Sequence, residues 1–272
     1  MTNYQLPPTN EEPLSAQAIT RGLDTVMLGQ RVEYRARVES TNDVARQLAD
    51  AGAAEGALVI TDEQTAGRGR LGRGWLAPAR TSLLMSMLLR PNLVPSQTAR
   101  VTMAVALGAC AGIRAATGLD AQLKWPNDLL LRGKKCGGIL AESSTVEERV
   151  EYVIVGLGLN VNFARASVDG IPADATTLAD ELGAPTPRVP LAQAILRAVE
   201  RYYLRLRAGD GDRLRDEFAA RLTTLNQRVR AQAPSGAEEG IAENVDDDGA
   251  LLLRRADGST VRLIAGDVTL AR

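Results

Sequence analysis

The segment Gln64-Thr65-Ala66-Gly67-Arg68-Gly69-Arg70-Leu71-Gly72-Arg73-Gly74-Trp75 decides how this chain is interpreted. Its four glycines and three arginines are typical of no regular element, whereas residues 57–61 before it and 82–89 after it have the composition of strands. Glycine lets the backbone fold around a ligand, and arginine pairs well with phosphate oxygens. The segment therefore predicts an anion-binding loop between two strands; taken alone, it also fits a flexible basic linker or an RNA-binding tract.

Outward from this loop, strands and helices are mixed without strict alternation. A helix with Ser40 as its N-cap is expected to run to about residue 51, and a tightly packed helix covers residues 96–117. A short helix could lie within 15–28, where Gly22 weakens it, and further helices are expected at 190–207 and 212–222. Further strands are expected at 31–38, 122–125, 129–132, 138–143 and 152–157. This order favours an α+β layer with a largely mixed sheet over a Rossmann fold.

From residue 225 onward, short strands replace this pattern. They are expected at 229–231, 240–243, 250–254, 261–264 and 268–270, and Asp-Gly pairs supply turns between some of them. About 48 residues of this kind predict a small β-barrel. We therefore expect an N-terminal arm over residues 1–30, loose over 1–13, a catalytic domain over 31–224 and a C-terminal barrel over 225–272.

Composition excludes several classes of function. The chain has 272 residues, 32 basic and 33 acidic side chains, two cysteines and no histidine. Without histidine, Ser-His-Asp and Cys-His catalysis and most zinc hydrolase designs are ruled out. A net charge of −1 gives no field that would hold the protein on nucleic acid or a membrane. The N-terminus has no signal-peptide pattern, so we expect a cytoplasmic enzyme.

Polar residues gather in two further places where strands are expected to end. In Lys124-Trp125-Pro126-Asn127-Asp128, the last two side chains suit a ribose or a solvated metal ion, although an ordinary type I turn is the simpler interpretation. In Gly133-Lys134-Lys135-Cys136-Gly137-Gly138, an inward Lys135 would neutralise a carboxylate and a phosphate together. Lys134 is expected to be solvated at a hairpin tip, and Cys136 to be a small core residue rather than a reactive thiol.

Two more segments are weaker on their own. Ser40-Thr41-Asn42 at a helix start offers donors and acceptors suited to a ureido group. The segment could equally serve only to cap the helix. Gly156-Leu157-Gly158-Leu159-Asn160 has glycines at a strand end but lacks the third glycine and the helix of a dinucleotide loop.

In this order and spacing, these segments together resemble the biotin protein ligases, from about residue 31 to residue 270. The combination of the Gly-Arg segment with Lys-Trp-Pro-Asn-Asp is the most specific part of the likeness. The resemblance implies a catalytic domain akin to class II aminoacyl-tRNA synthetases, with a mixed sheet, and an SH3-like C-terminal barrel. It also implies ATP and biotin as substrates, Mg²⁺ as cofactor and a biotin carboxyl carrier protein as partner.

The resemblance further implies residue roles. Lys135 and Arg70 would be catalytic, Lys135 bridging the biotin carboxylate and the α-phosphate. No protein ligand to a metal is assigned. The biotin contacts would be Ser40, Thr41, Asn42, Gln64, Arg68, Gly69, Arg70 and Lys135. The ATP contacts would be Arg70, Trp75, Asn127, Asp128 and Asn160.

Several alternatives stay open at this point. A lipoate protein ligase shares the fold and similar adenylation chemistry, but the Gly-Arg segment with Ser40-Thr41-Asn42 favours biotin. A nucleic-acid-binding module and a non-catalytic biotin-responsive regulator are the other hypotheses. About 30 residues precede the first catalytic strand, too few for the helix-turn-helix domain of bifunctional members, so we expect no operator binding. The family includes dimers paired through the catalytic sheet, so monomer and homodimer both remain open.

Overall fold

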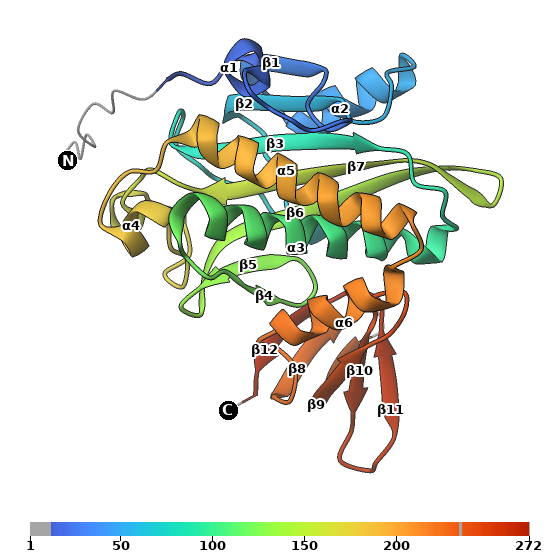
Figure 1. Cartoon of the computed structure of the whole chain (residues 1–272). Coiled ribbons are helices and arrows are strands. Elements are labelled where there is room, and N and C mark those ends of the chain that lie inside the picture. Colours follow the sequence, from blue (N-terminus) through green and yellow to red (C-terminus); the bar gives the residue numbers. More distant parts are fainter. Residues whose placement is uncertain (1–11, 234–235, 272) are drawn as a thin grey trace.

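The computed structural model describes residues 12–233 and 236–271, so most of the expected loose arm lies outside the described residues. Two sheets organise the chain (Figure 1). The larger has the order β1 (Val32–Val38), β2 (Leu58–Gln64), β3 (Ser82–Leu89), β7 (Arg149–Asn160), β6 (Lys134–Val146), β5 (Asp128–Leu131), β4 (Gln122–Lys124). The smaller has the order β11 (Thr260–Leu263), β10 (Leu251–Arg254), β9 (Gly236–Val245), β8 (Arg228–Ala233), β12 (Asp267–Leu270).

The larger sheet is mixed, because β1 pairs with β2 in parallel while β3, β7, β6, β5 and β4 follow in antiparallel pairs. The α-helices are α1 (Ala16–Thr20), α2 (Thr41–Asp50), α3 (Thr98–Thr117), α4 (Leu178–Leu182), α5 (Arg188–Arg207) and α6 (Gly211–Arg221). Short 3₁₀ turns are η1 (Arg70–Gly72), η2 (Pro95–Gln97) and η3 (Arg165–Ser167). The expected α+β fold with a mixed sheet is confirmed.

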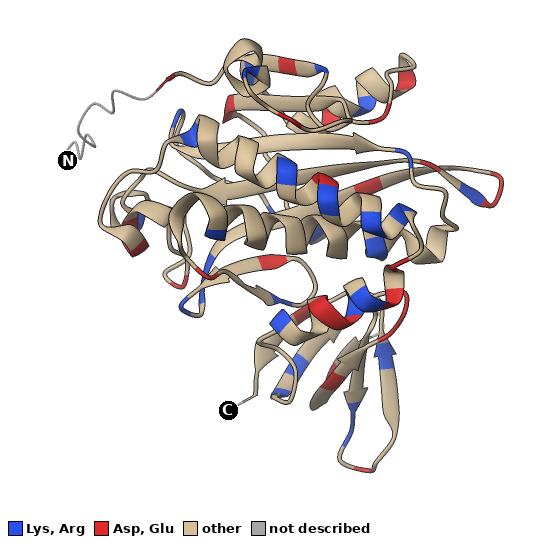
Figure 2. Cartoon of the chain, viewed as in Figure 1, with Lys and Arg blue, Asp and Glu red and all other residues tan. Residues whose placement is uncertain are grey.

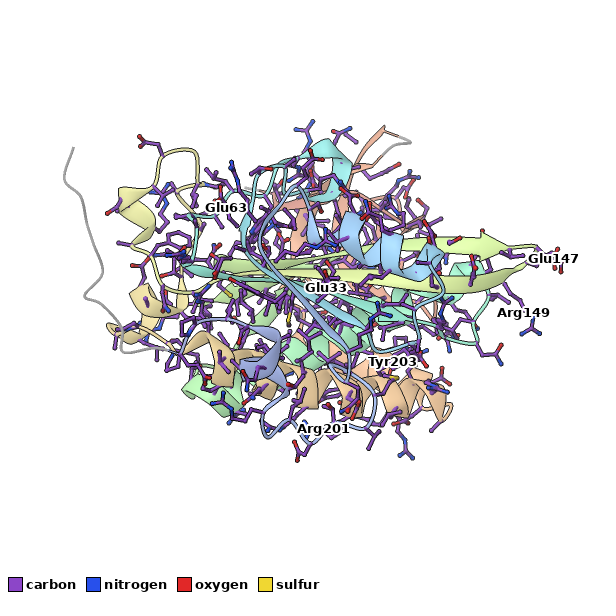
Figure 3. The ribbon with its side chains drawn as sticks, turned by 90° about the horizontal axis from the view of Figure 1, so that it is seen from above. Glu33, Glu63, Glu147, Arg149, Arg201 and Tyr203 are labelled. Atoms are coloured by element: carbon purple, nitrogen blue, oxygen red, sulfur yellow. The ribbon has the colours of Figure 1, made fainter. Side chains whose placement is uncertain are left out.

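The two faces of the large sheet have different partners. Figure 3 shows the sheet nearly edge-on, with α2 on one side and α5 on the other. Along β3, Leu83, Met85 and Met87 join the core that includes α3 and α5, whereas Leu88 packs with α2. Successive side chains of a strand point to opposite faces. Because α2 is only ten residues long, it covers part of its face, and the stretch beyond it is available for a site.

Helices α3 and α5 lie side by side across the other face (Figure 1) at unusually close range. A Cβ added at Gly108 would lie 2.5 Å from Val199 Cα, and one at Gly112 would lie 2.4 Å from Ile195 Cα. Two glycines one turn apart therefore let the backbones approach. The expectation of a tightly packed helix at residues 96–117 is confirmed.

We predict that Gly112→Ala lowers the free energy of unfolding by about 2–3 kcal/mol, because overpacking against backbone outweighs the better helix propensity of alanine. Urea unfolding followed by circular dichroism measures this change. Ala115→Ser on the exposed side of the same helix is the control. Equal stability of Gly112→Ala and the parent would contradict the close-packing argument.

The stretch Pro95–Thr117, which includes α3, is long and apolar enough to cross a membrane by length and composition alone. Its most apolar window is 61% buried inside the protein, and eleven residues of α3 are buried in the described structure. Packing in the core therefore accounts for the apolar character of this helix.

The smaller sheet continues the core of the larger one. Val229, Leu251 and Val268 belong to the same buried cluster as the α3 and α5 residues. Trp125 Nε1 donates to Gly249 O (2.9 Å), and Arg100 Nε donates to Asp247 O (2.9 Å). The smaller, C-terminal sheet, below α6 in Figure 1, is therefore packed against the layer of helices on the larger sheet rather than tethered by a linker.

The short helix expected within residues 15–28 is α1, which ends where Arg21 is extended and Gly22 has φ of +69°. The loop that follows is fixed by buried Glu200 of α5, whose carboxylate accepts three backbone N–H groups of residues 26–28 at 2.7 Å each. No local pattern predicts a carboxylate more than 170 positions away along the chain.

Strands β6 and β7 are longer than the expected 138–143 and 152–157. Their hairpin extends beyond the helices and carries charged residues of both signs at its tip (Figure 2), where Glu147 and Arg149 lie (Figure 3). This end of the hairpin is exposed on both faces, so its residues need not alternate between apolar and polar. The sequence pattern that predicts a strand therefore ends before the strands themselves end. Helix α4 was not expected.

Candidate active site

Glycines form the floor of the site on the α2 side of the sheet. A Cβ at Gly156 of β7 would lie 2.4 Å from Asn42 Oδ1, and one at Gly158 would lie 2.7 Å from the Trp75 ring. On β6, a Cβ at Gly138 would lie 3.4 Å from the same ring. Missing side chains therefore let α2 and the end of the Gly-Arg segment lie directly on the strand backbones.

The α2 end of this floor is a buried polar cluster. Gln64 Oε1 accepts from the Thr41 N–H (2.8 Å) and from the Thr41 hydroxyl (3.1 Å). The Ser86 hydroxyl, on β3, lies 2.7 Å from Thr41 Oγ1 and 2.6 Å from Asn42 Oδ1. Ser40 is the N-cap residue of α2, but its hydroxyl makes no capping hydrogen bond. The cluster holds hydroxyls and amides in fixed orientations at a helix start.

Within this cluster, Asn42 and Gln64 differ in how many of their hydrogen-bonding groups are bonded to the protein. Asn42 Nδ2 donates to Glu142 Oε2 (2.7 Å) and to Leu140 O (3.4 Å), while its Oδ1 faces Ser86. Because Gln64 Oε1 accepts twice from Thr41, its Nε2 faces the start of the Gly-Arg segment, where a Cβ at Gly67 would lie 3.1 Å away. Asn42 therefore braces α2 against the sheet, and Gln64 presents donors to the site.

The other end of the floor carries a cation. Lys135 Nζ on β6 lies 2.6 Å from Asp128 Oδ1 on β5 and 5.9 Å from the centroid of the Trp75 ring. The carboxylate is 21% exposed and the lysine side chain 37%, so the pair remains reachable from solvent. Trp75 Nε1 is buried, and no hydrogen-bond partner for it is found among the described residues.

The Gly-Arg segment forms a compact loop above this floor. Trp75 N–H donates to Gly67 O (2.8 Å) and Gly69 N–H donates to Arg73 O (2.7 Å). Arg68 donates to both carboxylate oxygens of Asp43 at 2.6 Å, and Arg73 pairs with Asp267 at the start of β12. The loop is thus attached to α2 on one side and to the C-terminal sheet on the other.

Arg70 differs from the two arginines that flank it. Its guanidinium donates to Gly266 O at 3.4 Å, and no carboxylate within ion-pair distance is found for it in residues 12–233 and 236–271. Partial burial lowers the pKa of Arg70 from its ordinary value, opposed by the charges of Asp267 and Asp128. Arginine remains charged at neutral pH, so Arg70 is a partly desolvated cation with no direct counter-ion among the described residues.

The two asparagines expected at the nucleotide are held by the protein backbone. Asn127 Nδ2 donates to Ile139 O (2.6 Å), and Asn160 Nδ2 donates to Thr176 O (3.1 Å). Asn160 Oδ1 is buried, and the described residues supply it with no hydrogen-bond partner.

Cys136 is buried, and that burial raises the pKa of its thiol. The expectation that it is a core residue is confirmed.

Three contributors to the site were not singled out from the sequence. Ser86 is a hydroxyl inside the fully buried strand β3, a signal that could have been noticed. Asp43 lies in the first turn of α2, a common place for an acidic residue, and it pairs with Arg68. Glu142 lies within the strand expected at 138–143, and it faces Asn42, Arg46 and Arg68. These contacts join distant positions, so local patterns do not contain them.

Comparison with known proteins decides the family. The Biotin/lipoate A/B protein ligase family matches residues 34–160, and the Biotin protein ligase C terminal domain matches residues 224–270. A biotin--[acetyl-CoA-carboxylase] ligase of Mycobacterium tuberculosis is 37% identical over 98% of this chain and 97% of its own length. This chain belongs to the biotin protein ligase family. A bifunctional ligase/repressor BirA of Bacillus spizizenii is 35% identical over 94% of this chain and 79% of its own.

Solved structures agree with this biotin protein ligase assignment. A biotin protein ligase from Aquifex aeolicus in complex with biotin and ATP superposes with a TM-score of 0.72 at 25% identity, covering 89% of this chain and 99% of that one. The expected fold class, a biotin protein ligase catalytic domain with a barrel-like C-terminal domain, is thereby confirmed.

For this biotin protein ligase family member, we predict that Gly158→Ala displaces the Trp75 ring, because the new Cβ would overlap it. Tryptophan fluorescence should report a more solvent-exposed indole, and formation of acyl-adenylate should fall by at least ~10-fold, about 1.4 kcal/mol. Gly138→Ala, whose Cβ would make an ordinary contact with the ring, should give the smaller spectral change. Identical spectra for Gly158→Ala and the parent would contradict the glycine-floor interpretation.

Proposed function

We propose that this chain is an ATP-dependent biotin protein ligase that forms biotinyl-5′-AMP and transfers biotin to a specific lysine of a biotin carboxyl carrier domain. One observation supports it above all others. A fixed polar cluster (Thr41, Gln64) and the Lys135 ammonium stand at opposite ends of one glycine floor. The Gly-Arg loop above that floor adds Arg70, for which no ion pair is found among the described residues. This arrangement suits a small molecule with a polar ring at one end and an acid at the other, as biotin has.

The residue roles follow from this placement. Thr41 and Gln64 would bind the ureido group, with Ser40 beside them and Asn42 bracing the helix start. Arg70 and Lys135 would face the carboxylate and the α-phosphate. Trp75 would cover the glycine floor, and Gly69 and Arg68 would shape the loop above it. The nucleotide would extend toward Asn127, Asp128 and Asn160. The buried Oδ1 of Asn160 has no hydrogen-bond donor among the described residues.

The first step joins two anions. A carboxylate oxygen of biotin attacks the α-phosphorus of ATP, the P–O bond to the β-phosphate breaks, and pyrophosphate leaves. Two unit charges 4 Å apart repel by about 4 kcal/mol at an effective dielectric of 20, which is roughly three decades of rate. Arg70 and Lys135 offset this repulsion through preorganised charge. No general base is needed, because the carboxylate is already ionised at neutral pH.

In the second step, the ε-amine of a carrier lysine attacks the acyl carbon and AMP leaves with the bonding electrons. The amine must lose a proton. Asp128, once Lys135 has turned to the substrate, is the carboxylate positioned to accept it. The loop over the floor would exclude water from the anhydride meanwhile.

Magnesium fits the site as an ion that arrives with ATP. Among the described residues, no group of three or more acidic, cysteine or histidine side chains could hold a metal ion. Mg²⁺ usually binds through one or two carboxylates together with substrate phosphates, and Asp128 is the carboxylate at the reacting end. When bound, the ion would screen the phosphate charges; the neutralisation assigned to Arg70 and Lys135 stands beside it.

The carrier partner is a carboxylase biotin domain, as the names of the relatives indicate for those proteins. We further propose that the protein acts in the cytoplasm and binds neither nucleic acid nor membrane, since its charges balance. The division into an arm (1–30), a catalytic domain (31–224) and a C-terminal barrel (225–272) is part of this proposal.

The proposal is tested by incubating the protein with ATP, Mg²⁺ and either biotin or lipoate and detecting acyl-adenylate and pyrophosphate by mass spectrometry. We expect biotinyl-AMP from biotin and none from lipoate. Lipoyl-AMP alone would move the chain to the lipoate ligases, whose family model it shares. No adenylate from either acid would refute the enzymatic function.

We predict that Lys135→Ala slows biotinyl-AMP formation by roughly 10²- to 10³-fold, because one of two neutralising charges is removed. Lys134→Ala is the matched control, since Lys134 is the exposed neighbour on the same strand. Pyrophosphate release under single-turnover conditions measures both. Comparable rates in the two variants would remove Lys135 from the reacting end.

We predict that Arg70→Gly still forms biotinyl-AMP but releases it at least ~10-fold faster, because the loop loses the cation that holds the adenylate phosphate. Dissociation of biotinyl-AMP measures this, and labelling of non-carrier proteins should increase. Retention equal to the parent would contradict the covering role of the loop.

A further inference from the structure

Arg68 is held by two carboxylates that come from different layers. Asp43 lies in the first turn of α2 and accepts both Arg68 donors at 2.6 Å. Glu142 lies on β6, 3.5 Å from Arg68 Nη2. The side chains of Asp43, Glu142 and Arg68 are 33%, 28% and 38% exposed, so the group is half-buried at the rim of the site.

The two carboxylates are themselves fixed. Asn42 donates to Glu142 Oε2 (2.7 Å), and Arg46 lies 3.1 Å from Glu142 and 3.7 Å from Asp43. The hydrogen bond from Arg68 lowers the pKa of Asp43, and Asp43 in turn raises the pKa of Arg68. These contacts therefore favour the charged forms of Asp43 and Arg68 and hold the group in one geometry.

Hydrogen bonds within the loop link the position of Arg68 to that of Arg70, two residues further on. Arg68 pairs across the loop with Gly74 in a short bridge, and Arg73 N–H donates to Arg70 O (3.2 Å). Fixing Arg68 therefore limits where Arg70 can be placed. The ion pairs with Asp43 and Glu142 also neutralise Arg68, so that Arg70 is the loop cation left to bind a carboxylate or phosphate in the site.

We propose that Asp43 and Glu142 form a carboxylate clamp that positions the Gly-Arg loop by holding Arg68, and so leaves Arg70 as the loop cation that faces the anionic substrate. The proposal rests on the proposed function for its catalytic consequence, but the clamp itself is a property of the loop. Asp43 and Glu142 are positioning residues, because they act through Arg68 and not on the reacting atoms.

Limited trypsin digestion tests the clamp directly, because cleavage after Arg70 requires the loop to open. In Asp43→Asn we expect cleavage there to be roughly 3- to 10-fold faster than in the parent, in the range of a half-exposed bidentate pair. Raising the salt from about 50 to about 500 mM should accelerate cleavage of the parent more than that of Asp43→Asn, since screening weakens an intact pair.

Two variants make this measurement specific. Asp43→Glu keeps a carboxylate in reach of Arg68 and should restore cleavage to within about 2-fold of the parent. Glu217→Gln removes a different two-pronged pair, with Arg205 (2.7 and 3.2 Å), between α5 and α6. It should leave cleavage after Arg70 unchanged. Parent-like cleavage in both Asp43→Asn and Asp43→Asn/Glu142→Gln would overturn the clamp.

Kinetics separate the clamp from the proposed function. Asp43→Asn should release biotinyl-AMP roughly 3- to 10-fold faster and raise the KM for biotin, with kcat of adenylation changed less than about 3-fold. A lower kcat with unchanged KM and release would refute positioning through the loop. If the parent makes no biotinyl-AMP while Asp43→Asn still accelerates cleavage, the clamp is supported and the proposed function fails.

Discussion

Direct contact of side chains with the backbone of β7 is the constraint on which the rest of the site depends. Asn42 lies against Gly156 and the Trp75 ring lies against Gly158, each closer than any Cβ would permit. Asn42 fixes the start of α2 and Trp75 fixes the end of the Gly-Arg loop. Both walls of the site are therefore placed by the absence of side chains on one strand, because a glycine surface admits a flat group where a methyl would exclude it.

This constraint works because the opposite face of the same strands is strongly apolar. Leu157 and Leu159 of β7 are buried in the core with α3 and α5, so the strand keeps its place despite its glycines. Glycine inside a strand normally weakens it. Here β7 is central and hydrogen-bonded on both sides, to β3 and to β6. The sheet can thus give one face to packing and the other to binding.

The fold and the chemical segments could be predicted because they are local. The Gly-Arg loop lies between two strands, Lys135 lies at the start of β6, and Ser40 precedes a helix, as their sequence patterns indicate. What could not be predicted are partnerships across the chain. Arg68 was expected at biotin or the phosphate, but its direct partner in the structure is Asp43. A residue pattern gives the kind of group and its element, whereas its partner depends on how elements meet.

The pairing of Lys135 with Asp128 gives the lysine ammonium a carboxylate partner in a partly buried site. A lone ammonium there would be costly to desolvate, whereas a carboxylate at 2.6 Å compensates for it. On the proposed mechanism, an incoming substrate acid would compete for the same ammonium, so that binding would exchange one anionic partner of Lys135 for another. Once the acid has become a mixed anhydride, its carboxylate charge is gone, but the α-phosphate keeps its negative charge. Lys135 would therefore stay beside the phosphate, and Asp128 would be left to accept the proton of the attacking amine. On the proposed mechanism, one ion pair therefore serves both halves of the reaction.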